Sequence, residues 1–439
     1  MTIPSLDRLL GQLHTSQWWT ATELREYQFG KLKTLIQHAF EHVPYYRRWF
    51  LEQSITIEDL LSVEGWRRVP LLTRFAIQEA NADLHSPMVP KGHGPVTQAL
   101  TSGSTGAAVL VRGTAVTDLF WRAMTHREHQ WHNRDFSGKL ASIRHLAKGV
   151  AAPPDGARDD NWGSATRGLI ETGPAVVLSV FSTIAEQADW LVRENPEYLM
   201  TYPSLLQTLA QYCLEHKIEL ANLQMVRTFG EVLDQETRDI CRQAWNVPLV
   251  DVYSCQEVGY VGLQCPDYEH YHVPAEDVMV EVLDEDDRPC QPGECGRVVI
   301  TTLHNFAMPL LRYDIGDYAE VGDPCGCGRG LPVLKRILGR SRNMFVLPNG
   351  DQVWPSLELS EAPELAELPI RQYQVVQRDR EHVDAFLVAV RPLSSEEEAI
   401  VSRSFHRAIR HPFQITYHYV NEIPRSPSGK YEEFRSEAT

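Results

Sequence analysis

The amino-acid sequence predicts an α/β protein with a large N-terminal domain of mostly parallel sheets flanked by helices. A small β-rich subdomain and a small α+β C-terminal domain complete the prediction. Three patterns lead to it: strand–helix alternation in the middle of the chain, an antiparallel pair after it, and a change of pattern near Gly339. At 439 residues the chain exceeds what one hydrophobic core usually supports, so two or more domains are expected. We expect a large domain over 1–339 and a small one over 340–439.

The middle of the chain alternates short apolar runs with amphipathic segments. The predicted strands are 176–181, 198–202, 225–229 and 249–253. The predicted helices are 184–193, 205–216 and 235–245. This βαβ pattern indicates a parallel sheet that helices bury on both faces.

Two later regions differ from this pattern. The runs 278–283 and 296–302 flank a turn-rich segment, which favours antiparallel strands. The last unit, about 100 residues long as is usual for a domain, offers further strands and a helix. Its predicted strands are 372–377 and 384–390, and its predicted helix is 395–410. This order indicates an α+β domain with a smaller core.

Two further helices are predicted in the N-terminal third. Apolar residues recur at helical spacing over 20–53, where Pro44 interrupts the helix. The segment 115–133 is also helical in pattern, and it carries His126, His129 and His132. Steps of three residues drift around a helix and this segment is very polar, so a solvated or pocket-facing helix is favoured over a metal site.

Composition narrows the class of protein. The hydrophobic fraction of 43% and charged fraction of 23% are ordinary for a globular protein. A formal net charge of −16 argues against a nucleic-acid partner or an anionic membrane. No apolar run is long enough to span a bilayer, and the first residues do not have the pattern of a signal peptide. We therefore expect a cytoplasmic protein; the oligomeric state stays open, with a homodimer as one alternative.

The cysteines are unevenly distributed. Eight cysteines are too sparse for a disulfide scaffold in a chain of this length, which indicates a reducing compartment. Six of the eight lie between Cys255 and Cys327, and such clustering needs a local explanation.

A run of Thr, Ser and Gly at Thr101–Gly106 lies between two short apolar runs, 96–100 and 107–111. Its backbone N–H groups and hydroxyls can face a phosphate, because Gly103 and Gly106 have no Cβ to obstruct the approach. It is not a Walker loop, since no Gly-Lys-Ser/Thr follows and the flanks are strand-like rather than strand and helix. Taken alone, an ordinary polar turn is the better explanation.

Four further segments carry chemistry-bearing side chains, and they follow the loop in a fixed order. They are Phe229–Val232, Tyr253–Glu257, Leu311–Asp317 with Gly339 and Arg340, and Pro424–Lys430. The first lies at the end of a predicted strand, where an open α/β sheet presents its ligand crevice. Each charged residue, taken alone, is better explained as a turn residue or a surface charge.

Together, these segments resemble the adenylate-forming superfamily of acyl-CoA synthetases, nonribosomal-peptide adenylation domains and luciferases. The branch that the chain resembles most is the phenylacetate–CoA ligase group. The runs His42–Arg47, Val69–Arg74 and Thr301–Tyr313 are similar to that branch, and the resemblance covers nearly the whole chain. It implies that a carboxylic acid attacks the α-phosphate of ATP, that pyrophosphate leaves, and that the protein neutralises phosphate charge. It also implies that the small C-terminal domain is mobile.

The resemblance implies a role for each matching residue. The loop residues Ser102, Gly103, Ser104, Thr105 and Gly106 would hold the β- and γ-phosphates. Glu257 would hold Mg²⁺ against the phosphates. The nucleoside would lie against Gly230, Glu231 and Tyr253 on the adenine side, and against Asp317 and Arg340 on the ribose side. Lys430 would stabilise charge on the α-phosphate and the carboxylate, so Lys430 and Glu257 are the expected catalytic residues.

The cysteine cluster has an explanation within the same resemblance. Cys265, His272, Cys325 and Cys327 supply three thiolates and one imidazole, which suit a closed tetrahedral zinc site with no vacant position. Similar Cys/His groups occur in part of the ligase branch, so structural Zn²⁺ is favoured over free thiols. His270 is an alternative to His272, and Cys290 and Cys295 fit less well. Bound zinc would join the loop after Glu257 to the loop after Asp317.

The chain departs from the family pattern at two places. Gly106 is followed by Ala107 and Ala108 where relatives commonly have Gly-Lys-Pro, so one phosphate-binding cation is absent. After Arg340 the chain has Arg342 at the expected hinge; we expect the rotation to occur nonetheless, because hinge positions tolerate several residue types.

Three functions remain in order of preference. The first is AMP-forming ligation of a carboxylic acid, aromatic or arylacetic, to coenzyme A. The second is an adenylase that passes its acyl group to an amine or a carrier-protein thiol. The third is a zinc-stabilised nucleotide-binding protein without ligase activity, an alternative that the missing loop lysine keeps open.

Overall fold

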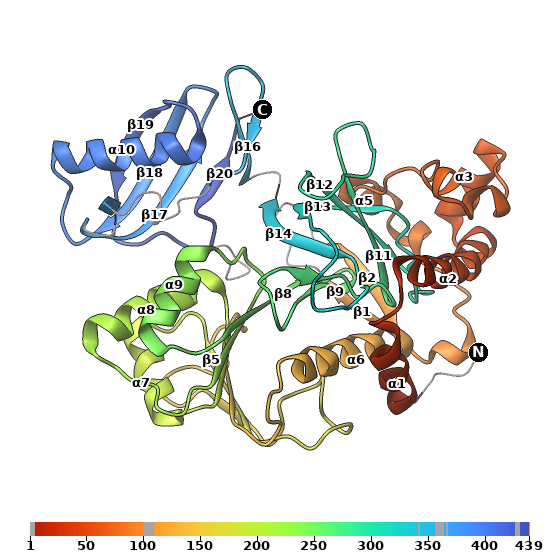
Figure 1. Cartoon of the computed structure of the whole chain (residues 1–439), viewed down its shortest axis with the longest axis horizontal. Helices are drawn as coiled ribbons and strands as arrows, with labels where there is room; N and C mark the ends of the chain where they lie inside the picture. The colour runs from red at the N-terminus through yellow and green to blue at the C-terminus, as the bar shows by residue number, and fades with distance from the viewer. Residues whose placement is uncertain are drawn as a thin grey trace. The chain divides into compact units, whose positions relative to one another are not determined.

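The computed structural model describes residues 5–100, 109–340, 343–355, 364–365, 368–425 and 431–438. Over these ranges the chain has the mixed α/β fold that the sequence predicts (Figure 1). It divides into two compact units, each built from segments distant in the sequence. Unit 1 comprises Met1–Leu140, Arg158–Ala175 and Val250–Ile337, and unit 2 comprises Ala141–Ala157, Val176–Leu249 and Leu338–Thr439.

Unit 1 begins with helices. They are α1 (Leu6–Ser16), α2 (Ala21–His42), α3 (Pro44–Gln53), α4 (Val63–Trp66), α5 (Arg74–Ala80) and α6 (Ala115–Trp131), with the 3₁₀ turns η1 (Glu58–Leu60), η2 (Asn81–Leu84) and η3 (Lys91–His93). Helix α2 starts where the hydroxyl of Thr20 accepts the N–H of Glu23 and the Glu23 carboxylate accepts the N–H of Thr20. Pro44 has no N–H and occupies the first position of α3, where none is needed. The predicted helix with its break at Pro44 is therefore confirmed.

The strands of unit 1 form two groups. A hairpin of β1 (Val96–Leu100) and β2 (Leu110–Thr114) is antiparallel. The other strands are β8 (Leu249–Cys255), β9 (Gly259–Gln264), β10 (Tyr271–His272), β11 (Val278–Leu283), β12 (Cys295–Thr302), β13 (Tyr313–Val321) and β14 (Val333–Arg340). Their order in the sheet is β11-β12-β13-β14-β10-β9-β8. The predicted antiparallel pair is confirmed, with Val278 opposite Thr302.

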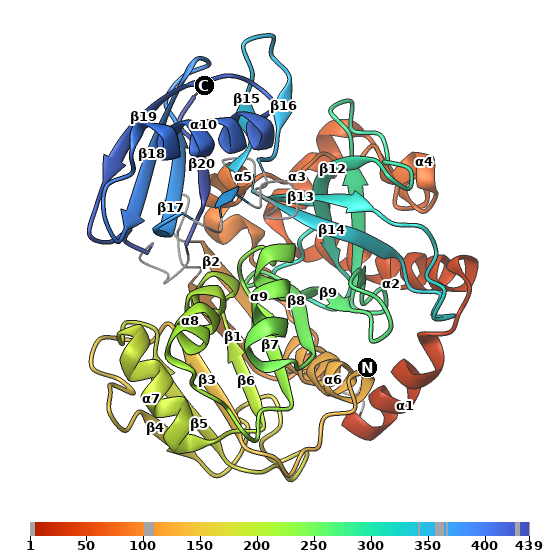
Figure 2. The ribbon, with the colours of Figure 1, turned by 60° about the vertical axis from the view of Figure 1, so that its left-hand side comes forward.

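The first part of unit 2 is the predicted βαβ region. Its strands are β3 (Leu140–Arg144), β4 (Ala157–Asp159), β5 (Ala175–Ser179), β6 (Tyr198–Thr201) and β7 (Met225–Phe229), of which β4 is the shortest. Its helices are α7 (Ile184–Glu194), α8 (Pro203–His216) and α9 (Gln235–Trp245). Strands β7-β6-β3-β5 follow in this order, and β6 and β7 are parallel. The apolar faces of α7 and α8 pack with the strand residues Leu178, Leu199 and Val226 in one core. Figure 2 shows the helices α7, α8 and α9 beside these strands.

The C-terminal part of unit 2 has its own sheet and core. Its elements are the short pair β15 (Phe345–Val346) and β16 (Gln352–Val353), the strands β17 (Ile370–Gln377), β18 (His382–Ala389), β19 (Gln414–Tyr419) and β20 (Phe434–Ser436), and α10 (Ser395–Ile409). The sheet order is β19-β18-β17-β20, and α10 covers one face of it (Figure 1). Phe405 from α10 is buried in the core of this part with Leu387 from β18. No helix within the described ranges has the length and apolar character needed to cross a lipid bilayer.

Candidate active site and metal centre

The predicted site residues are distributed over both units. The loop residues Ser102, Gly103, Ser104, Thr105 and Gly106, and also Lys430, lie outside the described residues. Tyr253, Glu257 and Asp317 belong to unit 1, whereas Gly230, Glu231 and Arg340 belong to unit 2.

In unit 1, two residues that are predicted to bind the nucleoside form a hydrogen bond with each other. Tyr253 lies on β8 and Asp317 on β13, and the Tyr253 hydroxyl donates to Oδ2 of Asp317 at 2.8 Å. Both side chains are buried. A hydrogen bond to a buried carboxylate fixes its orientation, because an unsatisfied buried charge is costly. The sequence placed these residues in one site, and the structure brings them together.

Glu257 has a partner that the sequence reasoning missed. It lies in the turn between β8 and β9, and its Oε1 is 3.1 Å from Nη1 of Arg74. Arg74 opens α5, which begins where the hydroxyl of Thr73 caps the N–H of Ala76. Leu72, just before this cap, bonds to the backbone of β13 through Asp314, so the start of α5 is held beside that strand. Arg74 was visible in the sequence only as the last residue of a family-like run.

The surroundings of Glu257 are poorly solvated. Burial raises the pKa of the Cys255 thiol well above its usual value, and the Glu257 carboxylate adds to this effect. Burial also raises the pKa of Tyr313, again with a contribution from Glu257. Cys255 is therefore a protonated thiol at neutral pH and does not act as a nucleophile. A carboxylate in such a setting attracts a cation strongly.

In unit 2, the segment after β7 contacts the start of the C-terminal part. Gly230 has a positive φ of 81°, a conformation that favours glycine. A Cβ built on Gly339, whose φ is 100°, would lie 3.4 Å from Cγ2 of Val232. The residues that follow Gly230 thus lie beside the chain that leads into Arg340.

The side chain of Glu231 is engaged by two backbone groups. Its Oε2 accepts the N–H of Ser204 at 3.0 Å, and its Oε1 accepts the N–H of Tyr431 at 2.7 Å. Nη1 of Arg425 lies 3.5 Å from the same Oε1. The carboxylate therefore faces the C-terminal part of the chain, which the sequence did not indicate.

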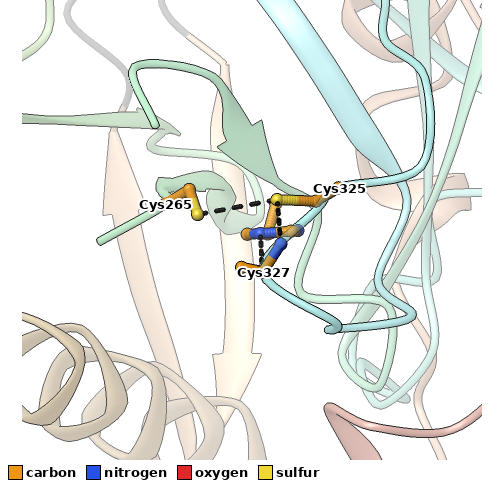
Figure 3. Close-up of side chains that lie close together, drawn as sticks. Cys265, Cys325 and Cys327 are labelled. Carbon is orange, nitrogen blue, oxygen red and sulfur yellow. Dashed lines mark hydrogen bonds between the residues drawn. The ribbon is translucent and has the colours of Figure 1, made fainter. Parts of the chain in front are cut away.

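The predicted metal ligands of unit 1 converge (Figure 3). Cys265 follows β9, His272 ends β10, and Cys325 and Cys327 lie between β13 and β14. Their ligand atoms all lie within 4.8 Å of one another. Sγ of Cys265 is 3.8 Å from Sγ of Cys325, and Sγ of Cys327 is 3.4 Å from Nε2 of His272. A tetrahedral zinc ion spaces its sulfur ligands at about 3.8 Å and a sulfur and a nitrogen at about 3.6 Å, so this donor set fits.

The neutral form of His272 suits a metal site, whereas the thiol of Cys325 has to lose its proton to bind. Burial lowers the pKa of His272 to about 4, against a hydrogen bond with Leu331, so its imidazole is neutral, the form that binds metal. Burial raises the pKa of the Cys325 thiol to about 12, so a metal ion would displace its proton on binding. Cys290 and Cys295 are not part of the cluster, in which His272 supplies the imidazole. Within the described residues the cluster is therefore the one that the sequence favoured.

The histidine-bearing helix is not solvated, which corrects one alternative. Within α6, Arg127, Glu128 and His129 are buried, and the ring of His126 stacks on Phe136 at a centroid distance of 5.5 Å. Buried charge explains the polar sequence, because Nη1 of Arg134 lies 2.6 Å from Oε2 of Glu128. The three histidines do not form a metal-binding group in the part of the chain that is described.

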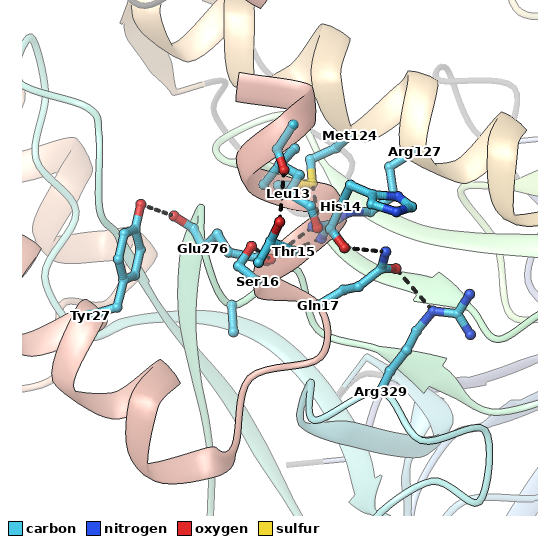
Figure 4. Close-up of polar contacts among 12 residues, drawn as sticks. Leu13, His14, Thr15, Ser16, Gln17, Tyr27, Met124, Arg127, Glu276 and Arg329 are labelled. Atoms are coloured by element: carbon cyan, nitrogen blue, oxygen red, sulfur yellow. Dashed lines mark hydrogen bonds and ion pairs between the residues drawn. The ribbon is translucent and has the colours of Figure 1, made fainter. Parts of the chain in front are cut away.

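The sequence also did not indicate how α1 is held. Arg127 from α6 pairs with Glu276 at 2.8 Å and donates to the carbonyl of Leu13, and the hydroxyl of Ser16 donates to Glu276 (Figure 4). Gln17 Oε1 accepts from Nε1 of Trp131 at 2.8 Å and from Nε of Arg329 at 3.1 Å. Since Arg329 follows Cys327 closely in the sequence, these bonds connect α1 to the metal-site loop.

Comparison with known proteins agrees with this geometry. Residues 52–308, more than half of the chain, match the AMP-binding enzyme family, and residues 348–436 match the CapK C-terminal domain. The chain therefore belongs to the AMP-binding enzyme family, which confirms the predicted superfamily.

Individual relatives are similar to this chain over most of its length. The chain is 27% identical over 407 residues to a phenylacetate-coenzyme A ligase of Thermus thermophilus, which covers 88% of this chain and 83% of that protein. It is 27% identical over 383 residues to a phenylacetate-coenzyme A ligase of Escherichia coli, with 84% and 82% covered.

A solved structure shows the same fold. The crystal structure of 2-hydroxyisobutyryl-CoA ligase in the postadenylation state superimposes with a TM-score of 0.74 at 19% identity, covering 96% of this chain and 90% of that chain. The predicted fold class is thus confirmed.

Proposed function

We propose that this chain is an AMP-forming carboxylate–CoA ligase. It uses ATP to convert a carboxylic acid into an acyl-adenylate and then transfers the acyl group to coenzyme A. The observation that carries this proposal is that proteins named phenylacetate-coenzyme A ligase match more than four fifths of the chain. On the same ground we propose an aromatic or arylacetic acid as the substrate class.

The first half-reaction forms one bond and breaks one. A carboxylate oxygen of the acid attacks the α-phosphorus of ATP, the bond to the bridging oxygen of the β-phosphate breaks, and pyrophosphate leaves. We assign the phosphates to Ser102–Gly106 and the charge on the α-phosphate to Lys430. Mg²⁺, held by Glu257, would neutralise phosphate charge.

The second half-reaction releases AMP. The sulfur of coenzyme A loses its proton and attacks the acyl carbon, and the bond between that carbon and the phosphate oxygen breaks. Asp317, oriented by Tyr253, is assigned to the ribose hydroxyls, and Arg340 is assigned to the ribose as well. Gly230, Glu231 and Tyr253 are assigned to the adenine.

The test is ATP–pyrophosphate exchange with phenylacetate and a panel of aromatic, aliphatic and amino acids, with and without coenzyme A. We expect exchange with an aromatic acid, and thioester and AMP in equal amounts once coenzyme A is present. Exchange without a thioester would favour transfer to an amine or a carrier protein. Lack of exchange with every acid would leave the nucleotide-binding alternative.

We also propose that Cys265, His272, Cys325 and Cys327 hold a structural zinc ion. The closed set of three thiolates and an imidazole supports this proposal, since no position is left for substrate. The ion would join β9, β10 and the loop before β14.

Metal content of the purified protein tests the zinc proposal. We expect about one zinc ion per chain, lost in Cys265→Ser together with a lower melting temperature. Cys295→Ser is the matched control, because Cys295 lies outside the cluster and is exposed. Equal zinc content in both variants would contradict the assignment.

We further propose that the large domain covers 1–339 and the small domain 340–439, with rotation about the position of Arg342. A cytoplasmic location and the choice between monomer and homodimer stay predictions, which cell fractionation and light scattering test.

A further inference from the structure

One carboxylate of unit 2 joins two segments that are remote in the sequence. Glu231 follows β7, and its two oxygens accept the N–H of Ser204 and the N–H of Tyr431, at 3.0 Å and 2.7 Å. These partners lie 27 and 200 residues away along the chain. Hydrogen bonds that a charged acceptor makes are stronger than neutral ones.

The contact with Ser204 explains why a carboxylate suits this position. Ser204 is in the first turn of α8, where backbone N–H groups have no partner within the helix. Tyr202, the residue that precedes α8, makes no side-chain cap, and Pro203 has no N–H to donate. Glu231 therefore supplies the anionic acceptor that the start of this helix favours.

Arg425 strengthens the contact from the other side. Its Nη1 donates to the hydroxyl of Ser204 at 2.9 Å and lies 3.5 Å from Oε1 of Glu231. The side chains of Arg425 and Glu231 are only 17% and 6% exposed, so water screens this pair little. Glu231, Ser204, Arg425 and Tyr431 form one network, which we call the Glu231 network.

Two members of the Glu231 network flank the segment that carries Lys430. Arg425 and Tyr431 are the described residues on either side of residues 426–430. When the residues on both sides of a short segment are fixed, the segment has fewer conformations. Orienting its reactive group then costs less entropy. A contact at the flanks thus affects a rate without touching the substrate.

We infer that Glu231 is a positioning residue for adenylation, because its carboxylate binds Arg425 and the N–H of Tyr431, the residue that follows Lys430 in the chain. This inference rests on the proposed function. It concerns the first half-reaction, in which Lys430 is assigned to the α-phosphate. It also gives the Glu231 side chain a role distinct from lining the adenine pocket.

The main variant is Glu231→Gln. An amide keeps the size of the side chain but has one oxygen, so it cannot accept both N–H groups, and it loses the charge that attracts Arg425. We expect kcat for ATP–pyrophosphate exchange with phenylacetate to fall 10- to 100-fold, with the KM for ATP changed by less than threefold. A side chain that only lines the adenine pocket would instead raise the KM for ATP.

The second half-reaction supplies the internal control. Thioester formation from added phenylacetyl-adenylate and coenzyme A should stay within twofold of the wild-type rate in Glu231→Gln. Equal loss in both half-reactions, or a lowered melting temperature that accounts for the loss, would overturn the inference in favour of a structural role. If the wild-type protein exchanges with no acid, the proposed function fails instead.

Three further variants separate the contributions of Arg425 and Ser204 to the Glu231 network. Arg425→Ala removes the cation and should lower exchange as Glu231→Gln does, and Arg425→Lys should restore part of it. Ser204→Ala keeps the backbone N–H and removes one acceptor of Arg425, so its effect should be smaller. Arg391→Gln is the matched control, since Arg391 pairs with Glu397 on the exposed surface of the C-terminal part.

Amide hydrogen exchange tests the contact without any substrate. In the wild-type protein the amide hydrogen of Tyr431 should exchange slowly, because Glu231 accepts it. In Glu231→Gln it should exchange at least tenfold faster, whereas amides in α10 should not change. Equal rates for Tyr431 in the two proteins would overturn the inference.

Discussion

Two arginine–carboxylate pairs of unit 1 have similar N···O distances but differ in how deeply their side chains are buried. Arg127 and Glu276 are 2.8 Å apart, with side chains 4% and 0% exposed. Arg74 and Glu257 are 3.1 Å apart, with side chains 23% and 10% exposed. The first pair lies between α1 and α6 with further partners on both sides, and the second lies at the edge of β8 and β9.

The difference shows how to tell a structural charge from a functional one. Burial alone would raise the pKa of Glu276, but Arg127 and the hydroxyl of Ser16 outweigh it, and the pKa is lowered. The contacts of the Glu276 carboxylate with Arg127 and Ser16 are internal to the fold. Glu257 keeps some exposure, which suits a group that exchanges partners when a metal-bound nucleotide enters.

Removing Arg127 should have the largest effect. In Arg127→Met the carboxylate of Glu276 is left buried without its cation, which costs about 3–5 kcal/mol. Urea unfolding followed by tryptophan fluorescence measures the loss. The double variant Arg127→Met with Glu276→Leu should recover much of it; if it does not, lost packing rather than the orphaned charge is the cause.

Glu257→Gln should leave stability almost unchanged and lower activity. We expect exchange to fall about 100-fold, equivalent to ~2.7 kcal/mol of transition-state stabilisation, because the amide binds Mg²⁺ weakly. The free energy of unfolding should change less than in Arg127→Met, because the Arg74–Glu257 pair is more exposed than the Arg127–Glu276 pair. A loss of stability as large as that of Arg127→Met would show that the two pairs do not differ in kind.

Glu236 differs from both of these carboxylates, because its neighbours are anions and not an arginine. Burial and the charge of Asp234 raise the pKa of Glu236 to about 7, against a hydrogen bond from Gln207, and Glu433 lies in the same acidic group. The folded protein thus holds this proton more tightly than the unfolded chain. The stability that this proton contributes is present below pH 4.5 and is lost as pH rises to about 7.

Glu236→Gln removes this dependence. We expect the variant to become more stable than wild type between about pH 4.5 and 7, by ~1–2 kcal/mol at the upper end, since the side chain is only partly buried. Melting temperatures across this range measure the difference. Glu215→Gln on the exposed face of α8 should show no such trend, and parallel curves for Glu236→Gln and wild type would refute the assignment.

Local patterns predicted local elements well. The structure has β7, α9 and β11 at the bounds that the sequence indicated, because helical and strand periodicity are properties of short segments. Helix α1 was not predicted, since its eleven residues carry no long repeat and their partners lie elsewhere in the chain. The short strand β10 has only two residues and no pattern of its own.

Pairings across the chain could not be predicted in the same way. The cysteine cluster was found because metal ligands have distinctive chemistry whatever their separation. Arg74 and Glu257 are 183 residues apart, and an arginine in a loop has many equivalent surface explanations. The partners of Glu231 were missed for the same reason, since two of its three contacts are backbone N–H groups that every sequence offers.

The way in which α1 is held has a consequence for synthesis of the protein. Ser16 and Gln17 bond to Glu276 and Arg329, which follow 260 and 312 residues later. At translation rates of roughly 5–20 residues per second, α1 leaves the ribosome on the order of 15–60 s before these partners exist. Its partners in α6 come earlier, since Arg127 and Trp131 follow Leu13 and Gln17 by only 114 residues. The helix can therefore dock on α6 first, and its bonds to Glu276 and Arg329 are among the last that close unit 1.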